Sequence, residues 1–331
     1  MNRYSEFDII KRFFSPLSAE ADGAFGLAND AALWQPDEGC DAVITTDCLV
    51  AGVHFFASDP PDSIAEKLLA VNLSDIAAMG ARPTAYTLTA ILSEEIGDDW
   101  IGSFAKGLRN AQKKYAVVLL GGDTVATPGP LTFSLTTFGS VECGKALSRG
   151  GAHAGDDIYV SGTIGDAALG LQLLRKELHV VDDGHADFLI NRYRRPEPRL
   201  EVGNAILGIA SSAIDVSDGL SADLGHIAQQ SCVDLEVKVA DVPLSGAVKA
   251  CTKVDKGLLE CILGGGDDYE LVFSATSDQR AAISALSNDF SVKITKIGRA
   301  VDPIDDNRPE VQFVDTTGST VAITTRGYRH F

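Results

Sequence analysis

Six aspartates each lie in a short stretch of small or apolar residues, where a carboxylate would be partly withdrawn from water. They are Asp30, Asp47, Asp75, Asp123, Asp215 and Asp218. A carboxylate in such surroundings must be paired, hydrogen-bonded or bound to a metal. No matching set of Lys or Arg is interleaved with these stretches. The fold therefore has to supply partners for the six, and hard divalent cations with the phosphates they carry are the partners that the pattern favours.

The charge balance agrees with that interpretation. The chain has 331 residues, enough for two domains, with 28 Lys+Arg against 46 Asp+Glu and a net charge of −18. Such an excess argues against a nucleic-acid partner or an anionic membrane surface. An acidic protein that handles phosphates needs metal ions to bridge the like charges. A generally solvated acidic surface is the simpler source of most of this charge.

The cysteines and the N-terminus indicate the compartment. None of the six cysteines forms a C-x-x-C pair, and a chain of this size does not need a disulfide framework. The N-terminal residues have no apolar signal core, and no apolar run approaches the ~20 residues of a membrane span. We expect reduced thiols and a soluble, cytoplasmic protein without a membrane partner.

The hydrophobic pattern of the first half predicts the order β, α, β, α, β, β after a short helix at 9–14. The expected strands are 41–55, 84–94, 116–120 and 131–141, and the expected helices are 63–79 and 97–114. A capping box at Ser63 and Glu66 would start the first helix, and Gly80 would end it. Asp75 falls within that helix's apolar stripe, although an exposed position at a frayed helix end is the alternative.

A run of small residues, Gly150–Gly155, is the best domain boundary, which divides the chain into residues 1–148 and 149–331. The second part alternates expected strands at 157–161, 212–215, 235–239, 271–275, 292–299 and 312–324 with expected helices at 166–176, 186–194, 198–209 and 218–230. The fold class is therefore α/β, with two domains.

Several short motifs carry oxygen ligands at predicted strand ends. Gly121-Gly-Asp123-Thr fits a phosphate approach with a metal ligand, or a simple turn. In Asp215-Val-Ser-Asp218-Gly a helix N-cap would explain Asp218 but not Asp215. Thr45-Thr46-Asp47 ends another expected strand, and the familiar Gly-rich phosphate loops and kinase catalytic loops are absent.

Three further features have structural alternatives. His54 is close in sequence to Asp47, but a lone His is more often structural. Arg149 fits a phosphate clamp or a surface ion pair. Residues 264–270, Gly-Gly-Gly-Asp-Asp-Tyr-Glu, could shape a pocket, although a turn before a strand is the default interpretation.

Taken together, these segments resemble the thiamine-monophosphate kinase family, within the superfamily that also contains aminoimidazole-ribonucleotide synthetase and selenophosphate synthetase. The resemblance runs nearly end to end. It is carried by residues 45–55, 70–83, 121–124, 214–220, 265–271 and 327–331. The segment Ala70-Val-Asn-Leu-Ser-Asp-Ile-Ala-Ala-Met-Gly-Ala-Arg-Pro83 is long and specific for the superfamily, and the C-terminal Gly-Tyr-Arg-His-Phe favours the kinase branch.

The resemblance implies an N-terminal α/β domain, residues 1–148, that binds ATP and Mg²⁺ and joins its sheet to that of a second copy to form a barrel. It implies a C-terminal α/β domain at 149–331, with ATP held between the domains by several Mg²⁺ ions. The implied reaction is direct transfer of the γ-phosphoryl group of ATP to thiamine monophosphate, giving thiamine diphosphate and ADP without a dedicated catalytic base.

The resemblance also implies roles for individual residues. The expected Mg²⁺ ligands are Asp30, Thr45, Thr46, Asp47, Asp75, Asp123, Asp215 and Asp218. The expected ATP contacts are Gly122, Asp123, Arg149 and Ser217, and the expected contacts to thiamine monophosphate are His54, Asp267 and Thr325.

This chain departs from the family pattern at three positions. Asn29 stands where the family has a first Asp before Asp30, Asp267 stands in place of Glu, and Thr325 stands in place of an aromatic residue. Two alternatives therefore stay open: another ATP-dependent synthetase of the superfamily, and a metal-binding dimeric protein without turnover. No Cys stands in an N-terminal Gly-rich loop, which counts against selenophosphate synthesis.

Overall fold

The computed structural model describes residues 4–179, 182–305, 308–324 and 327–328. The chain divides into two compact units, each of which is described by itself. Unit 1 comprises Met1–Ile76 and Ala81–Gly144, and unit 2 comprises Ala77–Gly80 and Lys145–Phe331. The functions expected of residues 1–148 and 149–331 stay predictions.

Unit 1 is built on a four-stranded sheet in the order β1-β4-β2-β3. Its strands are β1 (Cys40–Val50), β2 (Arg82–Ser93), β3 (Val118–Thr127) and β4 (Thr132–Glu142). The strand β4 pairs antiparallel with both β1 and β2, whereas β2 and β3 pair in parallel. A helix connects β2 to β3, as a parallel crossover requires. The expected order of strands and helices in this half is confirmed.

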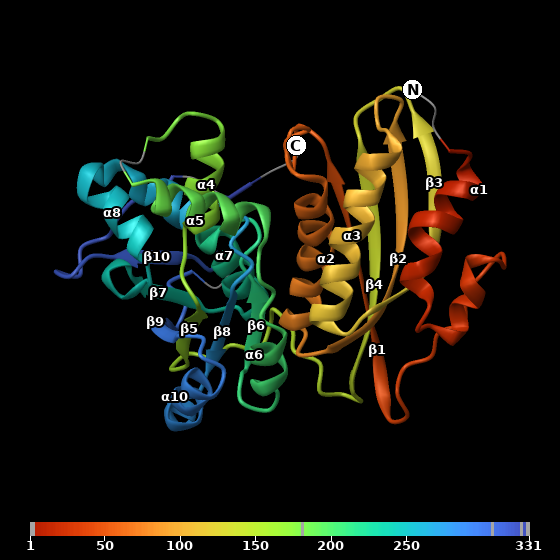
Figure 1. Ribbon diagram of the computed structural model, residues 1–331. Helices are drawn as coiled ribbons and strands as arrows, with labels where there is room; N and C mark the ends of the chain where they lie inside the picture. Colours follow the sequence, from red (N-terminus) through yellow and green to blue (C-terminus); the bar gives the residue numbers. More distant parts are fainter. Residues whose placement is uncertain (1–3, 180–181, 306–307, 325–326, 329–331) are drawn as a thin grey trace. The chain divides into compact units, whose positions relative to one another are not determined.

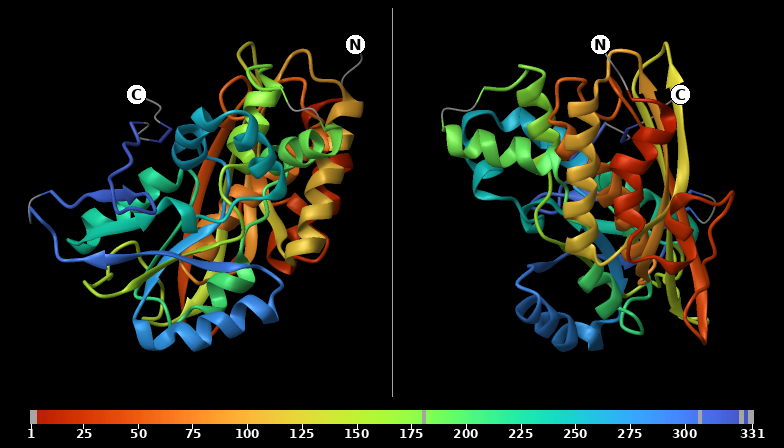
Figure 2. Two further views of the ribbon diagram at one scale, coloured as in Figure 1. Left: turned by 90° about the vertical axis from the view of Figure 1, so that its left-hand side faces the viewer. Right: turned by 45° about the vertical axis from the view of Figure 1, so that its right-hand side comes forward.

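Two helices, α2 (Pro61–Ala78) and α3 (Asp98–Tyr115), pack on this sheet, and Figures 1 and 2 show them side by side. The ring of Phe104 on α3 stacks on Phe133 of β4, with 4.4 Å between the ring centroids. The predicted capping box is wrong. Helix α2 begins at Pro61, and the Ser63 hydroxyl donates to the Pro60 carbonyl oxygen (2.8 Å). Proline suits the first helical position because its fixed φ is already helical and it has no N–H to leave unpaired.

The N-terminal segment is a chain of short helical turns that contacts β3 and α3. It consists of α1 (Glu6–Ile9), a π-helical turn η1 (Ile10–Phe14), and the 3₁₀ turns η2 (Ser15–Ser18) and η3 (Asp22–Leu27). The helix expected at 9–14 is therefore divided between α1 and η1.

Unit 2 contains a six-stranded sheet in the order β10-β7-β9-β5-β8-β6. Its strands are β5 (Asp157–Ser161), β6 (Ser212–Asp215), β7 (Asp234–Lys238), β8 (Leu271–Ala275), β9 (Ile294–Val301) and β10 (Val311–Val314). Among the described strands of this sheet, only β10 and β7 pair in parallel. The expected β5, β6 and β8 are confirmed residue for residue, but β10 ends ten residues before the strand expected to reach 324.

Helices cover both faces of the unit 2 sheet. One core joins the sheet to α4 (Asp166–Leu174), α5 (Asp183–Arg194), α7 (Leu220–Ser231), α8 (Gly246–Val254) and α9 (Leu259–Gly264). The other joins it to α6 (Leu200–Ala205) and α10 (Arg280–Asp289), and Figure 1 shows α10 across the sheet from α4, α5 and α8. The sequence did not predict α8, α9 or α10. The two-part α/β architecture itself is confirmed.

Two further expectations about the strands of unit 1 are wrong. Gly121–Asp123 does not follow a strand but lies inside β3, where Gly121 and Gly122 pair with Thr87 and Leu88 of β2. The strand expected at 41–55 ends at Val50, because the chain turns there and the His54 N–H donates to the Val50 carbonyl oxygen (2.9 Å). Among the described residues no helix combines the length and apolar character needed to cross a bilayer.

Candidate functional site

Two of the opening aspartates meet where β1 crosses α2. The Thr45 hydroxyl on β1 donates to Asp75 Oδ2 on α2 (2.5 Å). Two residues further along β1, the Asp47 N–H donates to the Asn72 side-chain oxygen on α2 (3.1 Å). Residues two apart on a strand share a face, so Thr45 and Asp47 both lie on the α2 side of the sheet. The structure therefore brings together three predicted metal ligands: Thr45, Asp47 and Asp75.

The ionisation of Asp47 reflects this crowding. Burial, together with the negative charge of Asp75, raises the pKa of Asp47 to about 6. Within the described residues Asp47 forms no salt bridge that would offset these effects. Two neighbouring carboxylates and a hydroxyl offer the hard oxygen donors that Mg²⁺ prefers. A divalent cation would supply the missing positive charge, so the donor set fits this metal.

Thr46 lies apart from this group, because alternate residues of a strand point to opposite faces. Its hydroxyl donates to the Leu135 carbonyl oxygen (3.1 Å) and accepts from the Thr136 hydroxyl (3.0 Å). Its side chain is exposed. The structure thus separates Thr46 from Asp47, although both were expected to bind metal.

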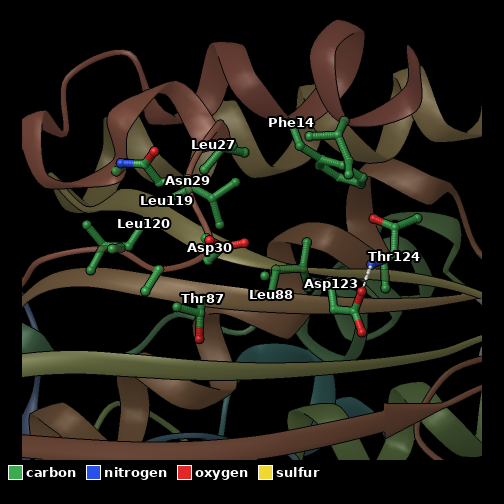
Figure 3. Close-up of a pocket in the computed structure, with 17 residues that line it drawn as sticks. Phe14, Leu27, Asn29, Asp30, Thr87, Leu88, Leu119, Leu120, Asp123 and Thr124 are labelled. Atoms are coloured by element: carbon green, nitrogen blue, oxygen red, sulfur yellow. Dashed lines mark hydrogen bonds between the residues drawn. The ribbon is translucent and has the colours of Figure 1, made fainter. Parts of the chain in front are cut away.

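Asp30 and Asp123 line a pocket of about 300 Å³ between the N-terminal segment and strands β2 and β3. Figure 3 shows Asp30 and Asp123 entering it from different segments, with Phe14 and Leu27 among the apolar walls. The Asp123 Oδ1 atom accepts the N–H of Thr124 (2.8 Å). The pocket therefore gathers Asp30, Gly122 and Asp123, together with Asn29.

Gly122 is required by the sheet itself. A Cβ atom at this position would lie 1.8 Å from the Leu88 carbonyl oxygen on β2, whereas a Cβ at Gly121 would meet nothing within 4 Å. Close strand pairing therefore explains why residue 122 is a glycine, without reference to a ligand. The space beside Gly121, by contrast, is open.

The strand register relates the two acidic groups of unit 1. Asp47 pairs with Leu135, Leu135 with Leu88, and Leu88 with Gly122, next to Asp123. These paired residues form one row across all four strands of the sheet. Asp47 and Gly122 are therefore three strand spacings apart, which corresponds to roughly 14 Å. The Asp47–Asp75 group and the Asp30–Asp123 pocket are thus two separate clusters on one row.

His54 closes the turn after β1. Its ring Nδ1 accepts the N–H of Val50 (3.0 Å), and its carbonyl oxygen accepts from the Lys67 ammonium (3.2 Å). An acceptor Nδ1 assigns the ring proton to Nε2 in the neutral imidazole. This arrangement gives His54 a definite structural role in the turn, beside any role toward substrate.

In unit 2, Asp215 is the last residue of β6, and Ser217 and Asp218 lie in the turn that follows it. The loop 264–270 is held directly against this turn. The Asp267 N–H donates to the Ser217 carbonyl oxygen (2.9 Å), and a Cβ at Gly266 would lie 2.1 Å from that same oxygen. The structure therefore brings Asp267 together with the Asp215–Asp218 motif.

Asp267 itself has a strained backbone. Its φ of 71° and the φ of 51° at Tyr269 lie in the left-handed region, which few non-glycine residues adopt. The Tyr269 hydroxyl donates to Asp267 Oδ1 (3.1 Å). Strain of this kind persists where the surroundings hold it, and it is concentrated at functional sites.

Arg149 lies in a segment that runs beside β6. The carbonyl oxygen of its neighbour Ser148 accepts the N–H of Ala213 on β6 (2.8 Å), and Arg149 itself is exposed. Its guanidinium forms no ion pair with any residue in the described part of the chain. Thr325 lies outside the described residues.

The sequence did not single out three residues that the structure places beside the predicted ligands. Asn72 orients the backbone of Asp47. On α7, ligand atoms of Asp223 and His226 lie within 4.8 Å of one another and of Asp218. Burial and the charges of Asp215 and Asp218 raise the pKa of Asp223 well above its usual range. The signal available was the i, i+3 spacing of Asp223 and His226 on a helix that starts just after Asp218.

Comparison with known proteins gives a consistent result over the full length. A family model described as AIR synthase related protein, N-terminal domain, matches residues 28–141. The chain is 40% identical over 327 residues to the thiamine-monophosphate kinase of Escherichia coli (strain K12), and the match covers 98% of both chains. It is also 40% identical to the solved thiamine-monophosphate kinase of Stenotrophomonas maltophilia K279a, with a TM-score of 0.84 and coverage of 96% of this chain and 98% of that chain.

A further solved structure, AaThiL complexed with AMPPCP and TMP, is 31% identical, with a TM-score of 0.77 and coverage of 93% of this chain and 97% of that chain. The expected family and its α/β fold are therefore confirmed. The chain belongs to the thiamine-monophosphate kinase family.

Proposed function

We propose that this protein transfers the γ-phosphoryl group of ATP to thiamine monophosphate, releasing thiamine diphosphate and ADP. The observation that carries the proposal is full-length identity of 40% to thiamine-monophosphate kinases, in a chain whose fold brings Asp47 and Asp75 together. The related complex with the ATP analogue AMPPCP and TMP supports these two substrates.

The chemistry suits a site that is rich in carboxylates. The acceptor is a phosphate group that is already ionised, so it needs little activation by a base. Catalysis then depends on in-line positioning and on neutralising the charge of the transferred group. Mg²⁺, when bound, supplies that neutralising charge. Asp47 and Asp75, with Thr45 donating to Asp75, would hold it. The pKa of Asp47, raised to about 6, still lies below 7, so the carboxylate is available to a cation at neutral pH.

The remaining roles are proposed from the family resemblance, including that of Thr46, whose hydroxyl bonds Leu135 and Thr136 on the opposite face of β1. We assign Mg²⁺ binding to Asp30, Thr45, Thr46, Asp47, Asp75, Asp123, Asp215 and Asp218. Contacts to ATP are assigned to Gly122, Asp123, Arg149 and Ser217. His54 and Asp267 are assigned to thiamine monophosphate. Arg149 is exposed and has no carboxylate partner among the described residues, which supports its role because such an Arg can bind phosphate in bidentate fashion.

We also propose that two copies associate through the unit 1 sheet. Along β1, Val43 and Leu49 are buried, whereas Ile44, which points to the face away from α2, is 59% exposed. Val125 on β3 is 42% exposed. Apolar side chains on an uncovered sheet face favour pairing with another surface. Light scattering should give twice the chain mass, and Ile44→Asp should give a monomer; a monomeric unsubstituted protein would contradict the proposal.

A cytoplasmic location is proposed as well. All six cysteines are free thiols, and the exposed ones, Cys48, Cys143 and Cys232, fit a reducing compartment.

The reaction is tested by incubating the purified protein with ATP, Mg²⁺ and thiamine monophosphate and by measuring ADP and thiamine diphosphate chromatographically. Equal amounts of the two products are expected, with no ADP above background when thiamine monophosphate is left out. Asp123→Ala should abolish turnover while the thermal unfolding transition stays intact, and Asp99→Asn, at an exposed position on α3, should leave turnover unchanged. ADP without thiamine diphosphate would indicate a different acceptor, and no ADP at all would refute the kinase activity.

A further inference from the structure

One buried carboxylate of unit 2 contacts the turn that carries two proposed ligands. Asp223, on the first turns of α7, is 2% exposed. Its Oδ2 atom accepts the N–H of Asp218 (3.1 Å) and the N–H of Gly219 (3.0 Å). Both donors precede α7, where backbone N–H groups have no partner within the helix. Asp223 therefore fixes two consecutive peptide units of the turn from inside the protein.

The rest of the turn is held from other directions. The Val216 N–H donates to the Glu270 carbonyl oxygen (2.7 Å), and the Val216 carbonyl oxygen accepts from the Tyr269 N–H (2.8 Å). The Asp218 carbonyl oxygen accepts from the Tyr328 N–H (3.1 Å). These contacts clamp the two flanks of the turn, while Asp223 holds its centre.

Gly219 adds a second constraint at the same point. Its φ is 124°, and a Cβ there would lie 2.6 Å from the Gly264 carbonyl oxygen. The backbone at Gly219 thus has one narrow conformation that only glycine can adopt, and the bond to Asp223 selects it.

One backbone donor of the turn is left available. Among the residues that the structure describes, the Ser217 N–H has no hydrogen-bond acceptor, although both the preceding and the following N–H groups have one. Ser217 and Asp218 are partly exposed, whereas Gly219 is buried. An unpaired N–H beside a carboxylate is suited to a metal-bound phosphate, because the N–H contacts the oxygen and the carboxylate contacts the cation.

We propose that Asp223 is a positioning residue for nucleotide binding: by accepting the Asp218 and Gly219 N–H groups, it keeps the Ser217 N–H and the Asp218 carboxylate available to the metal-bound phosphates. This inference rests on the proposed kinase function. Asp223 acts through the turn and does not itself contact the nucleotide. Its contribution requires an acceptor oxygen at this place and does not require a negative charge.

A direct metal-binding role for Asp223 makes the opposite prediction. Its ligand atom lies within 4.8 Å of those of Asp218 and His226, close enough for a shared cation. In that case the charge of Asp223 would matter more than its hydrogen bonds. Asp223→Asn separates the two roles, because the amide keeps an acceptor oxygen for both N–H groups but loses the charge.

The experiment measures binding of Mg²⁺·AMPPCP by calorimetry, together with KM for both substrates. Asp223→Asn should bind within about three-fold of the unsubstituted protein. Asp223→Ala should bind about 10- to 100-fold more weakly, the usual effect of removing a group that orients a ligand. The KM for ATP should rise with it, while the KM for thiamine monophosphate stays within about three-fold. Gln229→Ala, at an exposed position on the same helix, should bind like the unsubstituted protein.

Unchanged binding by Asp223→Ala, or a ten-fold loss in Asp223→Asn, would overturn the positioning role. Should Asp223→Ala fail to fold in circular dichroism, the Asp223→Asn affinity decides between the two outcomes. Absence of Mg²⁺·AMPPCP binding by the unsubstituted protein would instead count against the proposed function, so the two failures are distinguishable.

Discussion

Two groups of acids, one partly buried and one fully buried, have opposite electrostatic surroundings in this molecule. In unit 1, Asp47 lies beside Asp75, and burial with that like charge raises the pKa of Asp47 to about 6. In unit 2, Glu270 is fully buried, but it is surrounded by two arginines and a hydroxyl. Glu270 has cationic partners and is part of the structural framework. Asp47 has none among the described residues and is a candidate to bind a cation from solution.

The contacts of Glu270 show how completely a buried carboxylate can be satisfied. Arg199 donates to both of its oxygens, from Nε and from Nη2, at 2.6 Å each. Arg192 donates to Oε1 at 2.9 Å, and the Ser161 hydroxyl donates to Oε2 at 2.7 Å. Burial opposes ionisation, but these donors outweigh it, and the pKa of Glu270 is lowered. Bidentate contact with Arg199 is the geometry in which a buried ion pair is retained.

The largest expected effect comes from removing the charge of Asp47. Asp47→Asn should lower kcat by about 10²- to 10³-fold, because weaker binding of Mg²⁺ removes charge stabilisation from the transferred group. Its stability should change in the opposite direction. At pH 8 without Mg²⁺ the Asp47 carboxylate is ionised against its raised pKa, so Asn should increase the free energy of unfolding by about 1–3 kcal/mol. Urea unfolding in EDTA and steady-state assays measure the two effects.

Mg²⁺ provides the control for that variant. Added Mg²⁺ should stabilise the unsubstituted protein, because a cation that binds only the folded state shifts the equilibrium, and it should stabilise Asp47→Asn less. A variant that is both less stable and inactive would place Asp47 with Glu270 in the framework and would remove the distinction between the two groups.

Substitution of Glu270 should have the converse effect on stability, a loss rather than a gain. Glu270→Gln removes the buried carboxylate that both Arg192 and Arg199 contact and leaves them the longer pairs with Asp166 (3.8 Å) and Glu197 (3.5 Å). Removing one partner of a buried pair typically costs about 3–5 kcal/mol of stability. Glu197 is a matched control, because it pairs with the same Arg199 (3.5 Å) but its side chain is 54% exposed. Glu197→Gln should cost less than about 1 kcal/mol. Chemical denaturation of the two variants measures both, and equal losses would contradict a framework role that is specific to Glu270.

The comparison also predicts how pH affects metal binding. Because the pKa of Asp47 is raised to about 6, the carboxyl group is protonated below that pH and must release its proton to bind a cation. Apparent affinity for Mg²⁺·AMPPCP should therefore be constant above pH 7 and should fall up to about ten-fold per pH unit below 6. Calorimetry between pH 5 and 8 measures this dependence. Asp47→Asn should flatten it, and the same slope in that variant would exclude Asp47 as its source.

The sequence was sufficient for most elements of the fold and for much less of the acid chemistry. Strict alternation located β2 and β4 within two residues of their ends, because one buried face imposes a period of two. The sequence pattern did not predict that β3 continues through Gly121 and Gly122. Glycine has a low strand propensity, even at a position where close pairing with β2 requires it. Helices α8 to α10 were missed because they are at most ten residues long and their apolar positions follow no long stripe.

The sequence indicated which types of residue form the site, but it did not indicate which residues they contact in the folded protein. Asp47 and Asp268 are both carboxylates near small residues, and only the tertiary contacts separate them. Asp268 accepts the N–H groups of Gly165 (2.7 Å) and Ala167 (3.2 Å), about a hundred residues away in sequence. No local pattern encodes such a contact. The same limitation explains why Asp223 was not singled out, although it lies five residues from Asp218.

A third acid, the buried Asp268, is intermediate between the two groups. Burial dominates over its two N–H donors and raises its pKa to about 8. The folded protein therefore keeps a proton on Asp268 that the unfolded chain releases near pH 4. Below pH 4 the full stability is present, and between pH 4 and 8 Asp268 makes stability fall as pH rises, by at most about 1.4 kcal/mol per pH unit.

Asp268→Asn should remove that part of the slope, and the window from pH 6 to 8 avoids the contribution of Asp47. Urea midpoints of both proteins at pH 6, 7 and 8 provide the measurement. Parallel curves would show that Asp268 is ionised in the folded state and belongs with Glu270.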